Sequence, residues 1–268
     1  MNATDQTAAS LFHAGRLDDA IATAQAALRK APTDVNARVL LGELLAFSGN
    51  LERADVVLDA ASAIDPSTAL VMAEFRQLIR ADMARRQLFR DGRVPEFLSD
   101  PTETQRLQLA ALVAFRAGDL AEAMRQAEAA EQARPRTPGT HGDTAFDDLR
   151  DADDLLAGSF EVLTTTGKYF WIPAERVQLL EFHAPKRPRD LLWRRASMSV
   201  AEGPDGEVYL PAIYATDETL SDTLRLGRET DWRETNGGPV RGVGQRMFVV
   251  GEDAVPMMEL GAFKFDAA

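Results

Sequence analysis

The first half of the chain carries hydrophobic and small residues at the spacing of helix faces. Leu41 and Leu45 lie on one face of a predicted helix, and Leu58 lies on the matching face of the next one. Small residues beside them, such as Gly42 and Ala54, let two antiparallel helices approach closely while the leucines fill the seam. The pattern therefore predicts pairs of antiparallel helices.

This helical pattern returns along the chain. Gly49 stands 34 residues after Gly15, and Gly118 occupies the same place in a third copy. We interpret each copy as two helices joined at the glycine, followed by a proline that ends the second helix because it lacks a backbone N–H. Four further positions recur in register: Leu17, Leu51 and Leu120; Ala20, Ala54 and Ala123; Ala27, Ala61 and Ala130; and Pro32, Pro66 and Pro135.

The register resembles the tetratricopeptide repeat (TPR), whose period is 34 residues. Arg38 stands where that repeat usually has a large aromatic residue, and residues 67–99 fit poorly, with only a weak turn signal around Gly92. We expect about three divergent units and a longer helix from Val71 to Phe89. The alternative is a helical bundle whose periodicity is accidental. A helix start is also predicted with Asp100 as N-cap, Pro101 in the first turn and Glu103 as the returning acid.

Short apolar and aromatic runs separated by turn residues characterise the second half. Phe160–Leu163 and Tyr169–Pro173 read as two strands around a turn, and Ala196–Val200 and Val208–Pro211 as two more, separated by a turn at Pro204-Asp205-Gly206. This spacing is typical of a small, bent antiparallel sheet or barrel.

A connector rich in proline and glycine, residues 135–142, separates the two halves. We therefore predict a multidomain α and β protein. A TPR-like α-α superhelix would occupy residues 1–137, and a smaller α+β domain residues 138–268.

Composition and charge narrow the function classes. The chain has 268 residues, a net charge of −12 at pH 7, no cysteine and three histidines. Disulfides and thiolate zinc sites are excluded, and the acidic balance argues against broad binding to nucleic-acid phosphates. We find neither a signal-peptide pattern nor a run of roughly 18 apolar residues. We expect a cytoplasmic protein with protein partners, which binds neither nucleic acid nor membrane.

Residues 146–154 concentrate acidic side chains from Asp147 to Asp154. Counted from Asp151, an EF-hand calcium loop would need glycine and glutamate where Leu156 and Val162 stand. We interpret the segment as a helix with a solvated acidic face and its first acids near the N-terminal dipole. The alternative is a site for a metal or a basic partner.

Other motifs that could carry chemistry are weak. Gly242 and Gly244 invite a phosphate-loop interpretation, but Met247 replaces the last glycine and a strand-like run follows. The zinc-protease and serine-hydrolase templates are missing. The cluster Arg228–Trp232, in a predicted loop, can bind a partner or form a buried ion-pair latch. Three aromatic residues are expected in the core or at its rim rather than in a ligand cage: Trp171, Trp193 and Tyr214.

Six motifs occur in order along the second half: Phe146-x-Asp148-Leu149-x-Asp151-x-Asp153-Asp154, Gly167-x-Tyr169-x-Trp171-x-Pro173, Arg187-Pro188-Arg189-Asp190-Leu191-x-Trp193-Arg194, Leu210-Pro211-x-x-Tyr214, Arg225-Leu226-Gly227-Arg228-x-Thr230-Asp231-Trp232 and Gly242-x-Gly244-Gln245-Arg246. As a set they resemble the ImpE/SciE/TagJ family of type VI secretion accessory proteins. The resemblance implies a noncatalytic cytoplasmic protein without cofactor or metal. It also implies contact with the contractile sheath through its small subunit TssB, and a link to sheath recycling by the ClpV unfoldase.

The helical pattern and the resemblance meet in one hypothesis, in which stacked helix pairs offer an inner groove or a side surface to an amphipathic helix of the partner. Exposed arginines on the first helices would steer it: Arg38, Arg76 and Arg80. A rival surface in the second half has aromatic and arginine anchors: Trp193, Arg194, Arg228 and Trp232. Two other classes of function stay open. One is an enzyme or small-ligand domain using loops around Asp231 and residues 242–246, and the other is a TPR adaptor unrelated to secretion.

Overall fold

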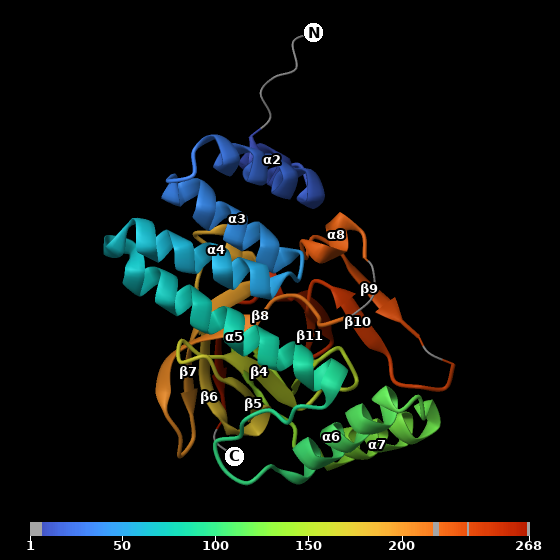
Figure 1. The fold of residues 1–268 in the computed structure, drawn as a ribbon. Helices are drawn as coiled ribbons and strands as arrows, with labels where there is room; N and C mark the ends of the chain where they lie inside the picture. The colour runs from blue at the N-terminus through green and yellow to red at the C-terminus, as the bar shows by residue number, and fades with distance from the viewer. Residues whose placement is uncertain (1–6, 217–219, 235, 267–268) are drawn as a thin grey trace.

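The computed structural model describes residues 7–216, 220–234 and 236–266, with a helical part followed by a sheet part (Figure 1). Three helical hairpins, α1 with α2, α3 with α4 and α6 with α7, confirm the predicted TPR-like region, and α5 is the predicted long helix. A short 3-10 turn, Pro66–Thr68, leads into α5. The helices are α1 (Ala8–His13), α2 (Leu17–Lys30), α3 (Val35–Phe47), α4 (Leu51–Ile64), α5 (Ala69–Asp91), α6 (Glu103–Arg116), α7 (Leu120–Ala133) and, within the sheet part, the short α8 (Asp222–Arg225).

One backbone conformation joins the two helices of each hairpin. Gly15, Gly49 and Gly118 all have φ of +79°, a left-handed value that favours glycine. In each hairpin the residue after the glycine donates its N–H to a carbonyl in the last turn of the first helix, at 3.0 Å. Gly92 ends α5 with the same φ, so the weak turn signal there marks a true helix end.

Helix α6 begins two residues later than predicted. Its N-cap is Thr102, whose hydroxyl accepts from the N–H of Gln105 at 3.2 Å, while the Gln105 side chain accepts from the N–H of Thr102 at 3.1 Å. This reciprocal pair satisfies two backbone donors at the helix start. The predicted start at Asp100 is wrong because Gln105, not Glu103, closes the capping box.

The strand ladders of the second half are antiparallel, which confirms the predicted sheet class. The largest sheet has the order β2-β1-β13-β6-β7-β8-β4-β5, β9 pairs with β10, and β11 lies between β12 and β3. The turn before β8 lies at residues 201–203, earlier than predicted, with Glu202 at φ of 55°. The strands are β1 (Gly139–His141), β2 (Thr144–Phe146), β3 (Leu149–Asp151), β4 (Ser159–Leu163), β5 (Tyr169–Pro173), β6 (Val177–Phe182), β7 (Trp193–Val200), β8 (Asp205–Pro211), β9 (Thr230–Arg233), β10 (Arg241–Gly244), β11 (Met247–Val250), β12 (Asp253–Pro256) and β13 (Ala262–Phe265).

The helices and the large sheet share a hydrophobic core. Phe75 of α5 meets Trp193 of β7 edge-on, with ring centroids 5.9 Å apart. A second core forms among the strands and contains Phe160, Leu180 and Phe263. In Figure 1, α5 crosses in front of the sheet, with α2, α3 and α4 toward one end and α6 and α7 toward the other. The helical and sheet parts therefore pack as one body around α5.

Two segments fold differently from their prediction. Residues 146–154 form no helix, because Phe146 ends β2 and Leu149–Asp151 is β3, which pairs with β11. Asp151 is 1% exposed and Asp153 0%, so the solvated acidic face is wrong for both. In the cluster Arg228–Trp232, predicted as a loop, the last three residues belong to β9, which pairs with β10, while Arg228 and Glu229 lie outside the strand. The partner of β3 lies far along the chain, beyond the reach of local patterns, whereas β9 pairs with the next strand in sequence.

Candidate functional site

A buried charge network joins the helices to the sheet. Arg85 of α5 donates from Nε and Nη2 to the two carboxylate oxygens of Glu161 on β4, at 2.9 and 3.0 Å. Its Nη2 also donates to the carbonyl of Ile213 at 3.0 Å. On the sheet side, the Tyr169 hydroxyl donates to Glu161 and accepts from Trp171 Nε1 at 2.6 Å. The second sequence motif therefore supplies structural partners of a buried carboxylate.

The network continues through Arg246 into the acidic segment. Arg246 donates from Nη1 to Glu161 at 2.8 Å and from Nε to Asp151. The Tyr214 hydroxyl donates to Asp151 at 2.9 Å. A neighbouring pair has Arg241 Nε donating to Asp153 at 2.7 Å. Asp151 thus meets Arg246 of the last motif and Asp153 meets Arg241, the residue just before that motif, so each carboxylate has a cationic partner.

The electrostatics of the network favour charged Glu161. Burial by itself raises the pKa of Glu161, but the guanidinium groups of Arg85 and Arg246 outweigh burial and lower that pKa to about 2. For Asp151, burial and the nearby Asp153 outweigh Arg246, so its pKa is raised. Because these carboxylates are committed to arginines and tyrosines, the arrangement positions α5 against the sheet rather than presenting an acid–base pair to a substrate.

Trp193 and Arg194, two of the predicted partner anchors, lie inside the protein. Trp193 is 1% exposed in the shared core. Arg194 is also buried, stacks over the Phe182 ring at 4.9 Å, and donates from Nη2 to the carbonyl of Leu260 at 2.8 Å. The prediction that they are surface anchors is therefore wrong, because neither side chain can reach a partner in the folded chain.

Arg228 ties the second half to the first helix. Its Nη1 and Nη2 donate to the carbonyls of His13 and Phe12, at 3.0 and 2.6 Å, at the end of α1. A cation at a helix C-terminus satisfies carbonyls that have no partner within the helix. Trp232 on β9 is 37% exposed and packs near Tyr214, with ring centroids 6.2 Å apart. Of the four predicted anchors of the second half, Arg228 and Trp232 are exposed, whereas Trp193 and Arg194 are buried.

The arginines predicted on the first helices are not gathered into one cluster. Arg38 on α3 is half-buried and donates to the carbonyl of Pro32 at 2.5 Å. Arg76 on α5 pairs with Asp55 of α4 at 2.7 Å and also contacts Asp59. Arg80 is exposed one helical turn beyond Arg76. Arg76 and Arg80 thus share α5, while Arg38 lies on a different helix.

Exposed apolar side chains surround the α4–α5 hairpin. Leu70 is 82% exposed and Val56 68%, and Ile64 and Val71 are also exposed where α4 passes into α5. Leu70, Ala73 and Arg80 follow helical spacing along one exposed stripe of α5. We call the set Val56, Ile64, Leu70, Val71, Ala73 and Arg80 the α4–α5 surface. Sequence reasoning identified Arg80 of this surface but missed its apolar residues, because a helical wheel of α5 does not separate them from the core residues.

The tetratricopeptide-type helical region and the mixed sheet region each match a known protein family. Residues 11–74 match the tetratricopeptide repeat family, and residues 143–264 match the family described as ImpE protein. Within the described residues, no helix is both long and apolar enough to span a bilayer.

A relative from Pseudomonas aeruginosa, "Type VI secretion system accessory component TagJ", is 35% identical to this chain, with 97% of this chain and 91% of the relative covered. The crystal structure of protein VPA1032 from Vibrio parahaemolyticus superposes with a TM-score of 0.91 at 27% identity, covering 97% and 98% of the two chains. The chain belongs to the ImpE/TagJ family of type VI secretion accessory components.

Proposed function

We propose that this protein is a noncatalytic, cytoplasmic accessory component that binds the sheath of the type VI secretion system through its small subunit TssB. Sheath handling and ClpV-linked recycling would follow from that contact. The observation that carries the proposal is the likeness to TagJ over 97% of the chain, which includes both the helical and the sheet region.

The side of the helices that faces the sheet is already occupied by the chain itself. Arg85 binds Glu161, Gln105 Nε2 donates to the carbonyl of Trp171 at 3.1 Å, and the Tyr209 hydroxyl donates to Glu74 at 2.6 Å. A partner helix could enter there only by displacing buried, hydrogen-bonded groups, which is costly. The inner groove is therefore disfavoured as the docking place, and the side surface of the repeat is favoured.

The α4–α5 surface has the chemistry for such a contact. An amphipathic helix buries its apolar stripe against exposed apolar side chains, and here Leu70 and Val56 are the most exposed of the large ones. Arg80 at the end of the same stripe can pair with an acidic residue of the incoming helix. Arg76 holds α4 and α5 together through Asp55, so the surface is preformed.

The test is a titration of purified TssB into the full-length chain and two variants. Leu70→Asp places a charge on the α4–α5 surface, and Val113→Asp places one at a similarly exposed valine on α6 (60% exposed). We expect the wild type and Val113→Asp to bind alike and Leu70→Asp to bind at least about tenfold more weakly. If wild-type protein does not bind TssB, or both variants bind like it, the proposal in this form fails.

A further inference from the structure

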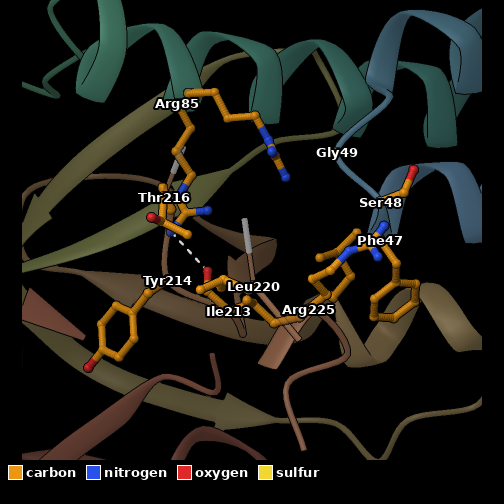
Figure 2. Close-up of a pocket in the computed structure, with 12 residues that line it drawn as sticks. Phe47, Ser48, Gly49, Arg85, Ile213, Tyr214, Thr216, Leu220 and Arg225 are labelled. Atoms are coloured by element: carbon orange, nitrogen blue, oxygen red, sulfur yellow. Dashed lines mark hydrogen bonds between the residues drawn. The ribbon is translucent and has the colours of Figure 1, made fainter. Parts of the chain in front are cut away.

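A cleft of about 350 Å³ lies where the α3–α4 turn, α5 and the segments after β8 meet (Figure 2). Phe47 contributes from the end of α3, Arg85 and Arg86 from α5, and Leu192, Tyr214 and Arg225 from the sheet region. Tyr214 and Arg225 belong to two of the six sequence motifs that the partner-binding proposal leaves unused. We propose that this cleft binds a small organic anion, with a phosphate or carboxylate group on an apolar body.

The lining of the cleft is rich in positively charged side chains. Three of the described lining residues are arginines and none is acidic. Arg86 donates from Nε to Asp82 at 3.1 Å, and Arg225 donates from Nη1 to Asp18 and Asp222 at 3.0 and 2.8 Å. Among the described residues, the remaining guanidinium nitrogens of Arg86 and Arg225 have no hydrogen-bond partner.

The geometry of the turn also suits an anion. A Cβ built on Gly49 would lie 2.9 Å from Arg86 Nη1, so the glycine lets this guanidinium lie against the turn backbone. Arg85 is held rigid by Glu161 and Ile213, as Figure 2 shows for its contact with the Ile213 carbonyl. Planar guanidinium groups that their neighbours already orient bind phosphate or carboxylate oxygens with little loss of freedom.

The apolar part of the lining defines the rest of the ligand. Phe47, Leu192, Ile213 and Tyr214 supply an aliphatic and aromatic wall beside the arginines. A volume of this size lies in the range of small-molecule sites, which combine apolar walls with a few orienting polar groups. A bound anion would bridge Arg86 of the helical part to Arg225 of the sheet part and so stabilise their packing.

The test uses the full-length chain and three simple probes: phenyl phosphate, benzoate and the neutral benzyl alcohol. At matched ionic strength and up to about 10 mM probe, we expect phenyl phosphate or benzoate to raise Tm in a dose-dependent way, and benzyl alcohol to leave Tm unchanged. The two anionic arms distinguish a phosphate site from a carboxylate site. Equal shifts with the neutral probe, or no shift with either anion, would overturn the proposal.

Variants distinguish binding of the probe in the cleft from a general effect of protein charge. Arg86→Gln and Arg225→Gln should each weaken binding of the anionic probe about tenfold, whereas Arg106→Gln on α6 should not. Ala215→Trp fills the cleft without removing an arginine, and should abolish the probe's effect while circular dichroism and TssB binding stay as in the wild type. Undiminished binding by folded Ala215→Trp contradicts the assignment. Because TssB binding is read separately, either proposal can fail without the other.

Discussion

Arg85 on α5 and Glu161 on β4 form a buried two-point contact, with both carboxylate oxygens engaged at 2.9 and 3.0 Å. The two residues lie 76 positions apart in the chain. Together they link the helical part to the sheet, where Arg246 also donates to Glu161 at 2.8 Å. The folded state should therefore be one cooperative unit, although its sequence shows two compositional halves.

Replacing Arg85 by methionine should remove one of the two guanidinium groups that compensate the buried negative charge of Glu161. We expect Arg85→Met to lower the free energy of unfolding by about 3–5 kcal/mol, as is typical when one partner of a buried pair is lost. Arg90→Met, at an exposed position of the same helix, should unfold close to the wild type. Urea unfolding followed by circular dichroism checks both. Equal stability of the two variants would mean that the pair is not what joins α5 to the sheet.

Close approach of α3 and α4 depends on Gly42. A Cβ there would lie 2.8 Å from Cδ2 of Leu58, which is too close for ordinary packing. We expect Gly42→Leu to cost about 2–3 kcal/mol through overpacking. Gly206→Leu provides the matched control, because no heavy atom lies within 4 Å of a Cβ at that position. Thermal unfolding of both variants tests the small-residue logic of the repeat, which a stable Gly42→Leu would refute.

Glu43 on α3 should make stability depend on pH. Burial raises its pKa to about 7, although Arg189 and Arg187 lower it in part. In the unfolded chain the pKa of a glutamate is about 4.3, so between these values the folded state holds a proton that the unfolded state releases. Stability contributed by protonated Glu43 is present below pH 4 and falls as pH rises through 7.

The variant Glu43→Gln stays neutral at every pH. We expect it to match the wild type near pH 5 and to exceed it by about 2–3 kcal/mol at pH 8. Glu52→Gln, at an exposed position of α4, should follow the wild type at both values. Urea unfolding at pH 5 and pH 8 gives the comparison. A constant difference between Glu43→Gln and the wild type across this range would rule out titration of Glu43.

Arg80 should affect how fast TssB associates more than how long it stays bound. Rim charges act mainly through long-range attraction, which salt screens. We therefore expect Arg80→Glu to slow association several-fold at low salt and the difference to shrink as salt is added. Arg125→Glu, exposed on α7, serves as the charge-matched control. Stopped-flow association at two salt concentrations distinguishes steering by Arg80 from a general effect of net charge.

Sequence reasoning succeeded where the signal is local. The glycines at 15, 49 and 118 mark helical hairpins because their left-handed φ is a property of single residues. Strands β4 and β5 were found because their turn joins neighbours in sequence. The buried network was missed because Asp151 and Arg246 become partners only after β3 pairs with β11, and no local period indicates that pairing. Trp193 was expected both in the core and as a partner anchor, and its packing against Phe75 of α5 confirms the core position.

Hydrogen exchange of the full-length chain, alone and with excess TssB, tests the central claim most directly. If the partner helix docks on the α4–α5 surface, amides within residues 52–80 should exchange more slowly in the complex, while the network around Glu161 stays protected in both states. Protection that appears instead around Trp232, with residues 52–80 unchanged, would contradict the account and place the contact on the sheet region.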